Sequence, residues 1–182
     1  MKVVIDTSSL LSLVRYYLPF DKENILFDFF KSKIESKEFI ILDKVHEECK
    51  YTSKGLVVKS LDYLSNKKYR VKTEELLPSN KFFNQVDNQF INRGIINKLD
   101  PVEFENRRNA FLNSADVKLI LFGLKYNNGL DNYSIVTEET EFSNDNKSFK
   151  KLPAICKILD LNVLTLPELL ELSEGVDFEI KK

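Results

Sequence analysis

The feature that most constrains the fold is a series of short, β-branched apolar runs separated by segments with helical patterning. These runs are VVI at 3–5, FIIL at 39–42, SIVT at 134–137 and NVLT at 162–165, and residues 69–71 could be a short extension after the segment 54–66. Their length and composition are those of buried strands, whereas segments such as 20–35 carry a broad apolar stripe at helical spacing. Strands that alternate with helices favour an α/β fold around a central parallel sheet.

The helices follow from caps and periodicity. We expect them over 10–17 behind a Ser8 or Ser9 cap, 20–35, 45–51 behind Asp43, 54–66, 115–126 behind Ser114, 153–160 and 167–174. Residues 73–113 mix amphipathic segments with turns, and we expect additional helices there, packed beside or over the sheet. A length of 182 residues fits one domain over 1–182, with 73–113 as a helical elaboration.

Composition excludes several classes of protein. Cys49 and Cys156 show no metal-binding spacing, and disulfides are not needed in a chain of this size, so we expect a reducing, cytoplasmic home. The N-terminus does not resemble a signal peptide, and no apolar run has the length of a membrane span. The balance of 27 basic against 28 acidic side chains argues against a globally basic nucleic-acid binder. This near-neutral balance remains compatible with a local basic rim around an acidic centre.

Four acidic residues stand after a predicted strand or at the opening of a helix: Asp6, Glu48, Asp116 and Glu139. Ligands of parallel sheets bind just beyond the carboxyl ends of the strands, so acids distant in sequence can converge there. Carboxylate oxygens are the hard ligands that Mg²⁺ or Mn²⁺ prefers. The sequence therefore predicts a divalent-metal site that uses these four carboxylates.

Structural interpretations compete with this prediction at the first three acids. Asp6 could equally be an N-cap, and the helix dipole would stabilise Asp116 in a first helical turn whatever its function. Glu48 flanks the buried face that Val45 and Cys49 define, whereas Glu47 points further towards solvent. Glu48 is the better candidate of this pair, although a single helical Glu is most often only solvated.

The region after SIVT offers the fourth acid and a basic group. The segment TEETE at 137–141 could be a solvated loop, but Thr137 and Glu139 share one side of an extended chain and could serve one metal-water cluster. Lys147, Lys150 and Lys151 follow in a polar loop, where a lysine run is more often simply solvated. By charge these lysines, together with Arg15, are candidates for contacting a phosphate backbone and for compensating the carboxylates.

The residues that several other catalytic mechanisms require are absent from the sequence. A haloacid dehalogenase-type phosphatase needs an acid two positions after its nucleophile, and Ser8 occupies that place after Asp6. His46 is the single histidine, which excludes a Ser/His/Asp set and indicates a surface or boundary residue rather than a ligand. No glycine-rich phosphate loop is present. Hydrolysis by metal-bound water needs neither feature.

Taken in order, VVIDTSSLL, VHEEC, NSADVKLILFGL and IVTEET resemble a PIN domain, the fold of the VapC-type toxin ribonucleases. The resemblance reaches from residue 3 to about 170, because KLPAICKILDLNVLTLPELL is similar to the last helix, strand and helix of that family. It implies a three-layer α/β/α fold, with Asp6, Glu48, Asp116 and Glu139 as metal acids and Ser8 and Thr137 as supporting hydroxyls. The sequence departs from the family in having Glu139 where Asp is more common, and in a longer middle region.

The resemblance implies a metal-dependent endoribonuclease, the toxin of a toxin–antitoxin pair, with a cognate antitoxin and with a homodimer as one assembly. Two other functions stay open. One is a catalytically inactive PIN-like module that binds RNA or protein, which would not need all four acids. The other is a structure-specific DNA nuclease, which usually needs a more basic surface.

Overall fold

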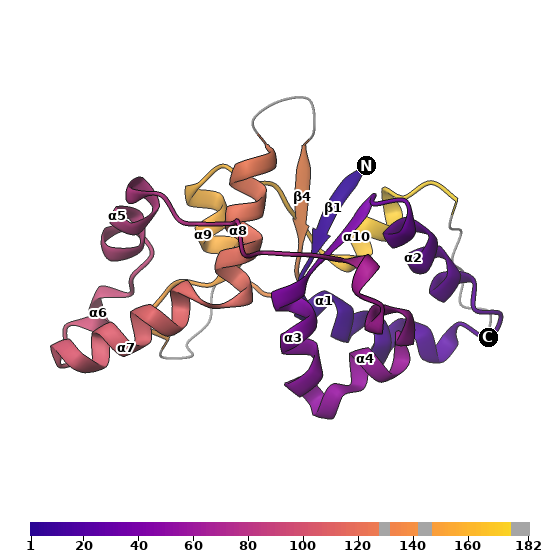
Figure 1. Ribbon diagram of the computed structural model, residues 1–182, viewed down its shortest axis with the longest axis horizontal. Coiled ribbons are helices and arrows are strands. Elements are labelled where there is room, and N and C mark those ends of the chain that lie inside the picture. Colours follow the sequence, from indigo (N-terminus) through magenta and orange to yellow (C-terminus); the bar gives the residue numbers. More distant parts are fainter. Residues whose placement is uncertain (128–131, 142–146, 176–182) are drawn as a thin grey trace.

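A five-stranded, all-parallel sheet forms the centre of the protein (Figure 1). The computed structural model describes residues 1–127, 132–141 and 147–175. The strand order is β3-β2-β1-β4-β5, with β1 at Lys2–Ile5, β2 at Phe39–Leu42, β3 at Arg70–Val71, β4 at Tyr133–Val136 and β5 at Val163–Leu164. The four predicted strands are present within a residue or two as β1, β2, β4 and β5, β3 adds a short edge strand, and the predicted α/β class with a parallel sheet is confirmed.

Helices flank the sheet. They are α1 (Thr7–Ser12), α2 (Ile25–Glu35), α3 (Asp43–Tyr51), α4 (Leu56–Ser60), α5 (Asn80–Asn88), α6 (Arg93–Ile96), α7 (Pro101–Leu112), α8 (Ala115–Tyr126), α9 (Leu152–Ile158) and α10 (Leu166–Glu171). In Figure 1, α8 and α9 lie on one side of β1 and β4, and α2 lies on the other. Gly123 lets α8 pack closely against Leu161, since a Cβ at Gly123 would stand 3.4 Å from the Leu161 side chain.

The strand order places a switch point beside the central strand. The chain moves from β1 to β2 to β3 in one direction, and then returns to place β4 and β5 on the other side of β1. Val3 of β1 pairs with Phe39 of β2 and with Ser134 of β4. Connections that leave β1 and β4 diverge, so a crevice opens at the carboxyl ends of these two strands, where α/β proteins bind ligands.

The core is the apolar interior of this sandwich. Val3, Val4 and Ile5 of β1 are fully buried, as are Ile135 and Val136 of β4. Such continuous apolar runs are expected for parallel strands covered on both faces. The short strands are therefore defined by burial on both sides rather than by alternation.

The middle of the chain forms a helical arm, which we define as α5, α6 and α7. Figure 1 shows the arm beyond α8, away from α2 and the first strands. Helices are thus present in the region 73–113, but they lie beyond α8 rather than directly against the sheet. The backbone of the arm also contacts a distant segment, because Ile91, between α5 and α6, forms an antiparallel bridge with Phe149.

Several predicted helix ends were wrong. Asp6, not Ser8 or Ser9, caps α1, and Asp43 is the first residue of α3, where its carboxylate accepts from the Thr73 amide and hydroxyl. The helix expected over 54–66 begins only at Leu56, because Ser53 and Lys54 adopt left-handed φ values of 51° and 59°. It ends at Ser60, since Leu61 has a non-helical φ of −110° and ψ of 64°. The helix expected over 20–35 begins at Ile25.

His46 is buried, contrary to the expected surface or boundary position. It is 4% exposed, and its Nδ1 lies 2.9 Å from Nη1 of Arg70. Arginine has no acceptor, so Nδ1 must accept and the ring proton must sit on Nε2. Burial first, and then the charges of Arg70 and Lys50, lower the His46 pKa from 6.5 to about 4.

No helix in the described ranges 1–127, 132–141 and 147–175 has the length and apolar character needed to cross a membrane.

The His46 pKa predicts a loss of stability on acidification. Between pH 6.5 and about 4, His46 is protonated in the unfolded chain but stays neutral in the folded protein. The free energy of unfolding therefore decreases as the pH falls through this range. We expect His46→Gln to lose about 2 kcal/mol less stability than the wild type between pH 7.5 and pH 5. Urea unfolding at both pH values measures the difference, and equal losses in the two proteins would contradict the assignment.

Candidate functional site

The Asp6 carboxylate joins the ends of β1 and β4. Its oxygens accept from the amides of Thr7 at 2.7 Å and Ser8 at 3.3 Å, and from the hydroxyls of Ser8 at 2.6 Å and Thr137 at 2.9 Å. The Asp6 amide donates to the Val136 carbonyl at 2.9 Å. Asp6 is therefore an N-cap and also lies at the switch point between the two strands, so its two interpretations are compatible.

Two hydroxyls connect Asp6 to the turn after β4. The Ser8 and Thr137 hydroxyl oxygens are 3.1 Å apart, and they accept from the amides of Glu138 and Glu139 at 3.0 Å and 3.2 Å. These bonds fix the turn that carries Glu139. Ser8 and Thr137 thus hold other groups in place, which fits the supporting position that the sequence predicted for them.

Glu48 reaches the same crevice from α3. Its Oε2 accepts from the Thr7 hydroxyl at 2.8 Å, whereas Glu47 is exposed and pairs with Lys44 at 3.0 Å. The expected choice of Glu48 over Glu47 agrees with this geometry. Thr7 was not singled out in the sequence, although its place directly after Asp6 was the available signal.

Asp116 enters the crevice from the first turn of α8. Burial raises its pKa to about 7, and the charges of Asp6, Glu139 and Glu48 add to the increase. Burial likewise raises the Glu48 pKa, and Asp6 and Glu139 contribute there too. Mutual repulsion of this kind requires the carboxylates to be near one another, so residues from four separate segments converge as predicted.

Glu139 combines a buried oxygen with a basic neighbour. Its Oε2 is buried and has no hydrogen-bond partner among the described residues, while Oε1 lies 4.0 Å from the Lys151 ammonium. An unsatisfied buried carboxylate oxygen is costly unless a cation or water completes it. Glu139 is therefore suited to a ligand that enters the crevice.

The predicted basic residues separate into two places. The charge of Lys147 lowers the pKa of both Asp116 and Glu48, so it partly compensates the acidic crevice. Lys150 donates to the Gln89 carbonyl at 2.7 Å on the helical arm. Arg15 instead donates to the Ser53 hydroxyl at 2.5 Å, at the end of α3. The structure groups the three lysines with the acids and does not place Arg15 with them.

The acids suit a hydrated divalent metal better than a complete protein cage. Within the described part of the chain, no group of three or more His, Cys, Asp or Glu side chains is arranged to hold a metal ion. Mg²⁺ usually keeps several waters and takes only one or two carboxylates, a number that the four acids can provide. The repulsion at Asp116 and the unpaired oxygen of Glu139 are features that a cation would relieve.

The fold and this crevice define an α/β protein with converging carboxylates at the carboxyl edge of a parallel sheet. Residues 3–177 match the family described as a domain of unknown function, DUF4411, and the chain belongs to that family. Comparisons with curated proteins and with solved structures gave no match.

The raised pKa of Asp116 predicts that its charge destabilises the metal-free protein. The folded carboxyl holds its proton up to about pH 7, whereas the unfolded one loses it near 3.8, so the destabilisation grows as the pH rises across this range. We expect Asp116→Asn to be roughly 2–4 kcal/mol more stable than the wild type at pH 8, with the gain shrinking towards pH 4.

Urea unfolding in EDTA at pH 8 and pH 4.5 measures this difference. Glu47→Gln is the matched control, because Glu47 is an exposed neighbour of the crevice, and it should change stability by less than about 0.5 kcal/mol. A loss of stability in Asp116→Asn at pH 8 would show that the carboxylate is not under repulsion.

Proposed function

We propose that the protein is a metal-dependent endoribonuclease. The observation that carries the proposal is the convergence of Asp6, Glu48, Asp116 and Glu139 at the switch point of the sheet, where burial, and then the charges of the other acids, raise the pKa of Asp116 to about 7. Stability alone does not favour placing four carboxylates together. Clustered acids with perturbed pKa values are typical of functional sites.

The residues divide into ligands and positioning groups. Asp6 and Asp116, with Glu48, would hold one Mg²⁺ or Mn²⁺, and the buried oxygen of Glu139 would orient a water or help a second ion. When bound, such an ion lowers the pKa of a bound water and offsets charge on the leaving oxygen of a phosphodiester. Thr7, bonded to Glu48, keeps that carboxylate turned towards the crevice.

The side chains around the acids also handle charge. An acidic crevice repels the phosphates of RNA, and Lys147 and Lys151 reduce this repulsion from the adjoining segment. The chain has a formal net charge of −1, so its attraction for nucleic acid must be local. A local basic surface suits a short stretch of single strand better than an extended duplex.

The resemblance to PIN domains supports the more specific part of the proposal. On that basis the protein is the cytoplasmic toxin of a toxin–antitoxin pair, held inactive by a cognate antitoxin, with a homodimer as one assembly. The parallel five-stranded sheet with helices on both sides is compatible with that fold. The carboxylates in the crevice favour the nuclease over an inactive binding module.

Cleavage of single-stranded RNA tests the proposal. We expect activity with Mg²⁺ or Mn²⁺, loss of activity in EDTA, and a fall of at least about 100-fold in kcat for Asp116→Asn, because one metal ligand is lost. Glu47→Gln should cleave like the wild type, since Glu47 lies outside the crevice. Product analysis on denaturing gels gives the rates.

The possible outcomes separate the alternatives. Equal cleavage by the wild type and Asp116→Asn would identify a contaminant. Preferential cleavage of branched DNA would favour the structure-specific DNA nuclease. Absence of both cleavage and calorimetric metal binding would leave the inactive binding module.

A further inference from the structure

A pocket of about 380 Å³ opens directly beside the acidic crevice. Asp116 and Glu139 line one part of it, and the helix α7 together with residues 147–151 lines the rest. This volume lies within the range of about 300–1,000 Å³ that is usual for ligand pockets. A molecule in the pocket would therefore touch the proposed metal site at one end.

The charges of the pocket differ from those of the whole chain. Two acidic residues line it against four basic ones, which are Arg107, Lys147, Lys150 and Lys151. The protein as a whole has a formal net charge of −1. Basic side chains are thus concentrated where a strand leaving the acidic crevice would lie, and their charge suits an anion.

The basic wall of the pocket is anchored to the helical arm. The amide of Asn92 donates to the Ser148 carbonyl at 2.8 Å, and the amide of Lys150 donates to the Phe90 carbonyl at 2.7 Å. The ring of Phe149 stacks on Phe111, with centroids 4.4 Å apart and planes only 7° apart. Residues 147–151, which we call the lysine segment, therefore form one packed unit with the helical arm beside the acidic crevice.

Arg107 connects the two parts of this unit and still has donors to offer. Its Nη1 donates to the hydroxyl of Ser148, a residue only 5% exposed, at 2.9 Å, and its Nη2 donates to Glu103 at 2.6 Å. A guanidinium has five N–H donors, so these bonds leave three. The Arg107 side chain is 41% exposed, which makes it accessible from the pocket.

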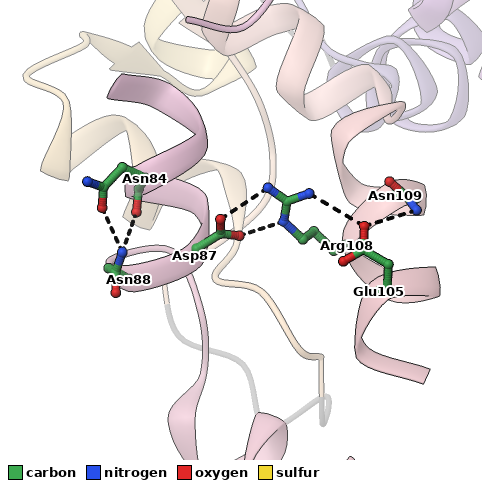
Figure 2. Close-up of polar contacts among 6 residues, drawn as sticks. All are labelled: Asn84, Asp87, Asn88, Glu105, Arg108 and Asn109. Atoms are coloured by element: carbon green, nitrogen blue, oxygen red, sulfur yellow. Dashed lines mark hydrogen bonds and ion pairs between the residues drawn. The ribbon is translucent and has the colours of Figure 1, made fainter. Parts of the chain in front are cut away.

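A clasp of polar contacts holds α5 against α7 (Figure 2). Arg108 donates to both oxygens of Asp87, at 2.6 Å and 3.1 Å, and it lies 3.7 Å from Glu105. Figure 2 shows that Asp87 comes from one helix and Arg108 and Glu105 from the other. Because paired contacts of this kind fix orientation, the clasp holds the α7 turn that carries Arg107.

We propose that this pocket binds the nucleotide adjoining the cleaved bond. Its phosphate is bound by Arg107 and the lysine segment, and Phe111 supplies apolar surface for the rest of the nucleotide. This proposal rests on the proposed function, since the acids define which bond is cleaved. In this proposal the helical arm binds the substrate beside the acidic crevice.

Arg107→Met tests the pocket through substrate binding. We expect KM for a short single-stranded RNA to rise at least about 10-fold with kcat within about 2-fold, because a phosphate contact made in both ground and transition states is lost. The slope of log affinity against log salt should fall by about one. Arg107→Lys should restore the slope, since it keeps the charge.

Arg93→Met is the matched control, because Arg93 is an exposed arginine on the same arm that does not line the pocket. It should leave KM and the salt slope unchanged. Near-UV circular dichroism checks that each variant is folded. If Arg107→Met is not folded, Arg107→Gln, which keeps hydrogen-bond donors without the charge, decides. A salt slope equal to that of the wild type would then contradict a charge contact.

A binding measurement separates this proposal from the nuclease proposal. Fluorescence anisotropy with the same labelled RNA is measured on Asp116→Asn, with and without Arg107→Met. Weaker binding on loss of Arg107 supports the pocket even if the wild type does not cleave RNA. Cleavage by the wild type with equal KM in Arg107→Met and Arg93→Met overturns the pocket and leaves the nuclease in place. Absence of RNA binding by Asp116→Asn overturns the pocket outright.

Discussion

The set of hydrogen bonds around the Asp6 carboxylate is the interaction on which the rest of the site depends. One side chain caps α1, binds the hydroxyls of Ser8 and Thr137, and so ties the end of β1 to the turn after β4. The position of Glu139 follows from that turn. Because β1 and β4 meet at the switch point of the sheet, one capping residue defines both a helix start and the floor of the crevice.

Burial, repulsion among the acids and compensation by a lysine then determine the protonation of the carboxyl groups in this crevice. Asp116 and Glu48 are pushed towards their neutral forms by burial and by the other acids, and Lys147 opposes that effect. The lysine belongs to a segment anchored on the helical arm. The arm and the sheet, which look separate in Figure 1, are thus coupled through charge at the site.

Much of the fold was predictable because its strands carry strong local signals. The runs at 3–5 and 39–42 are fully apolar, the run at 134–137 is rich in β-branched residues, and each of the three forms a strand of the parallel sheet. Failures came where tertiary contacts overrode local preference. Asp43 is a residue type that favours N-caps, but its carboxylate instead accepts a hydrogen bond from Thr73. The sequence indicated a boundary position for His46, but His46 is buried with Arg70 as its hydrogen-bond partner.

The sequence by itself determined the main strands of the sheet, the helix cap at Ser114, and the choice of Glu48 over Glu47, because these depend on neighbours in the chain. Only the tertiary structure decided that Glu48 meets Thr7, that Arg15 lies with Ser53, and that Arg107 bonds Ser148 in the lysine segment. These outcomes depend on contacts between residues tens of positions apart. No local pattern encodes such contacts, since packing of the whole chain sets them.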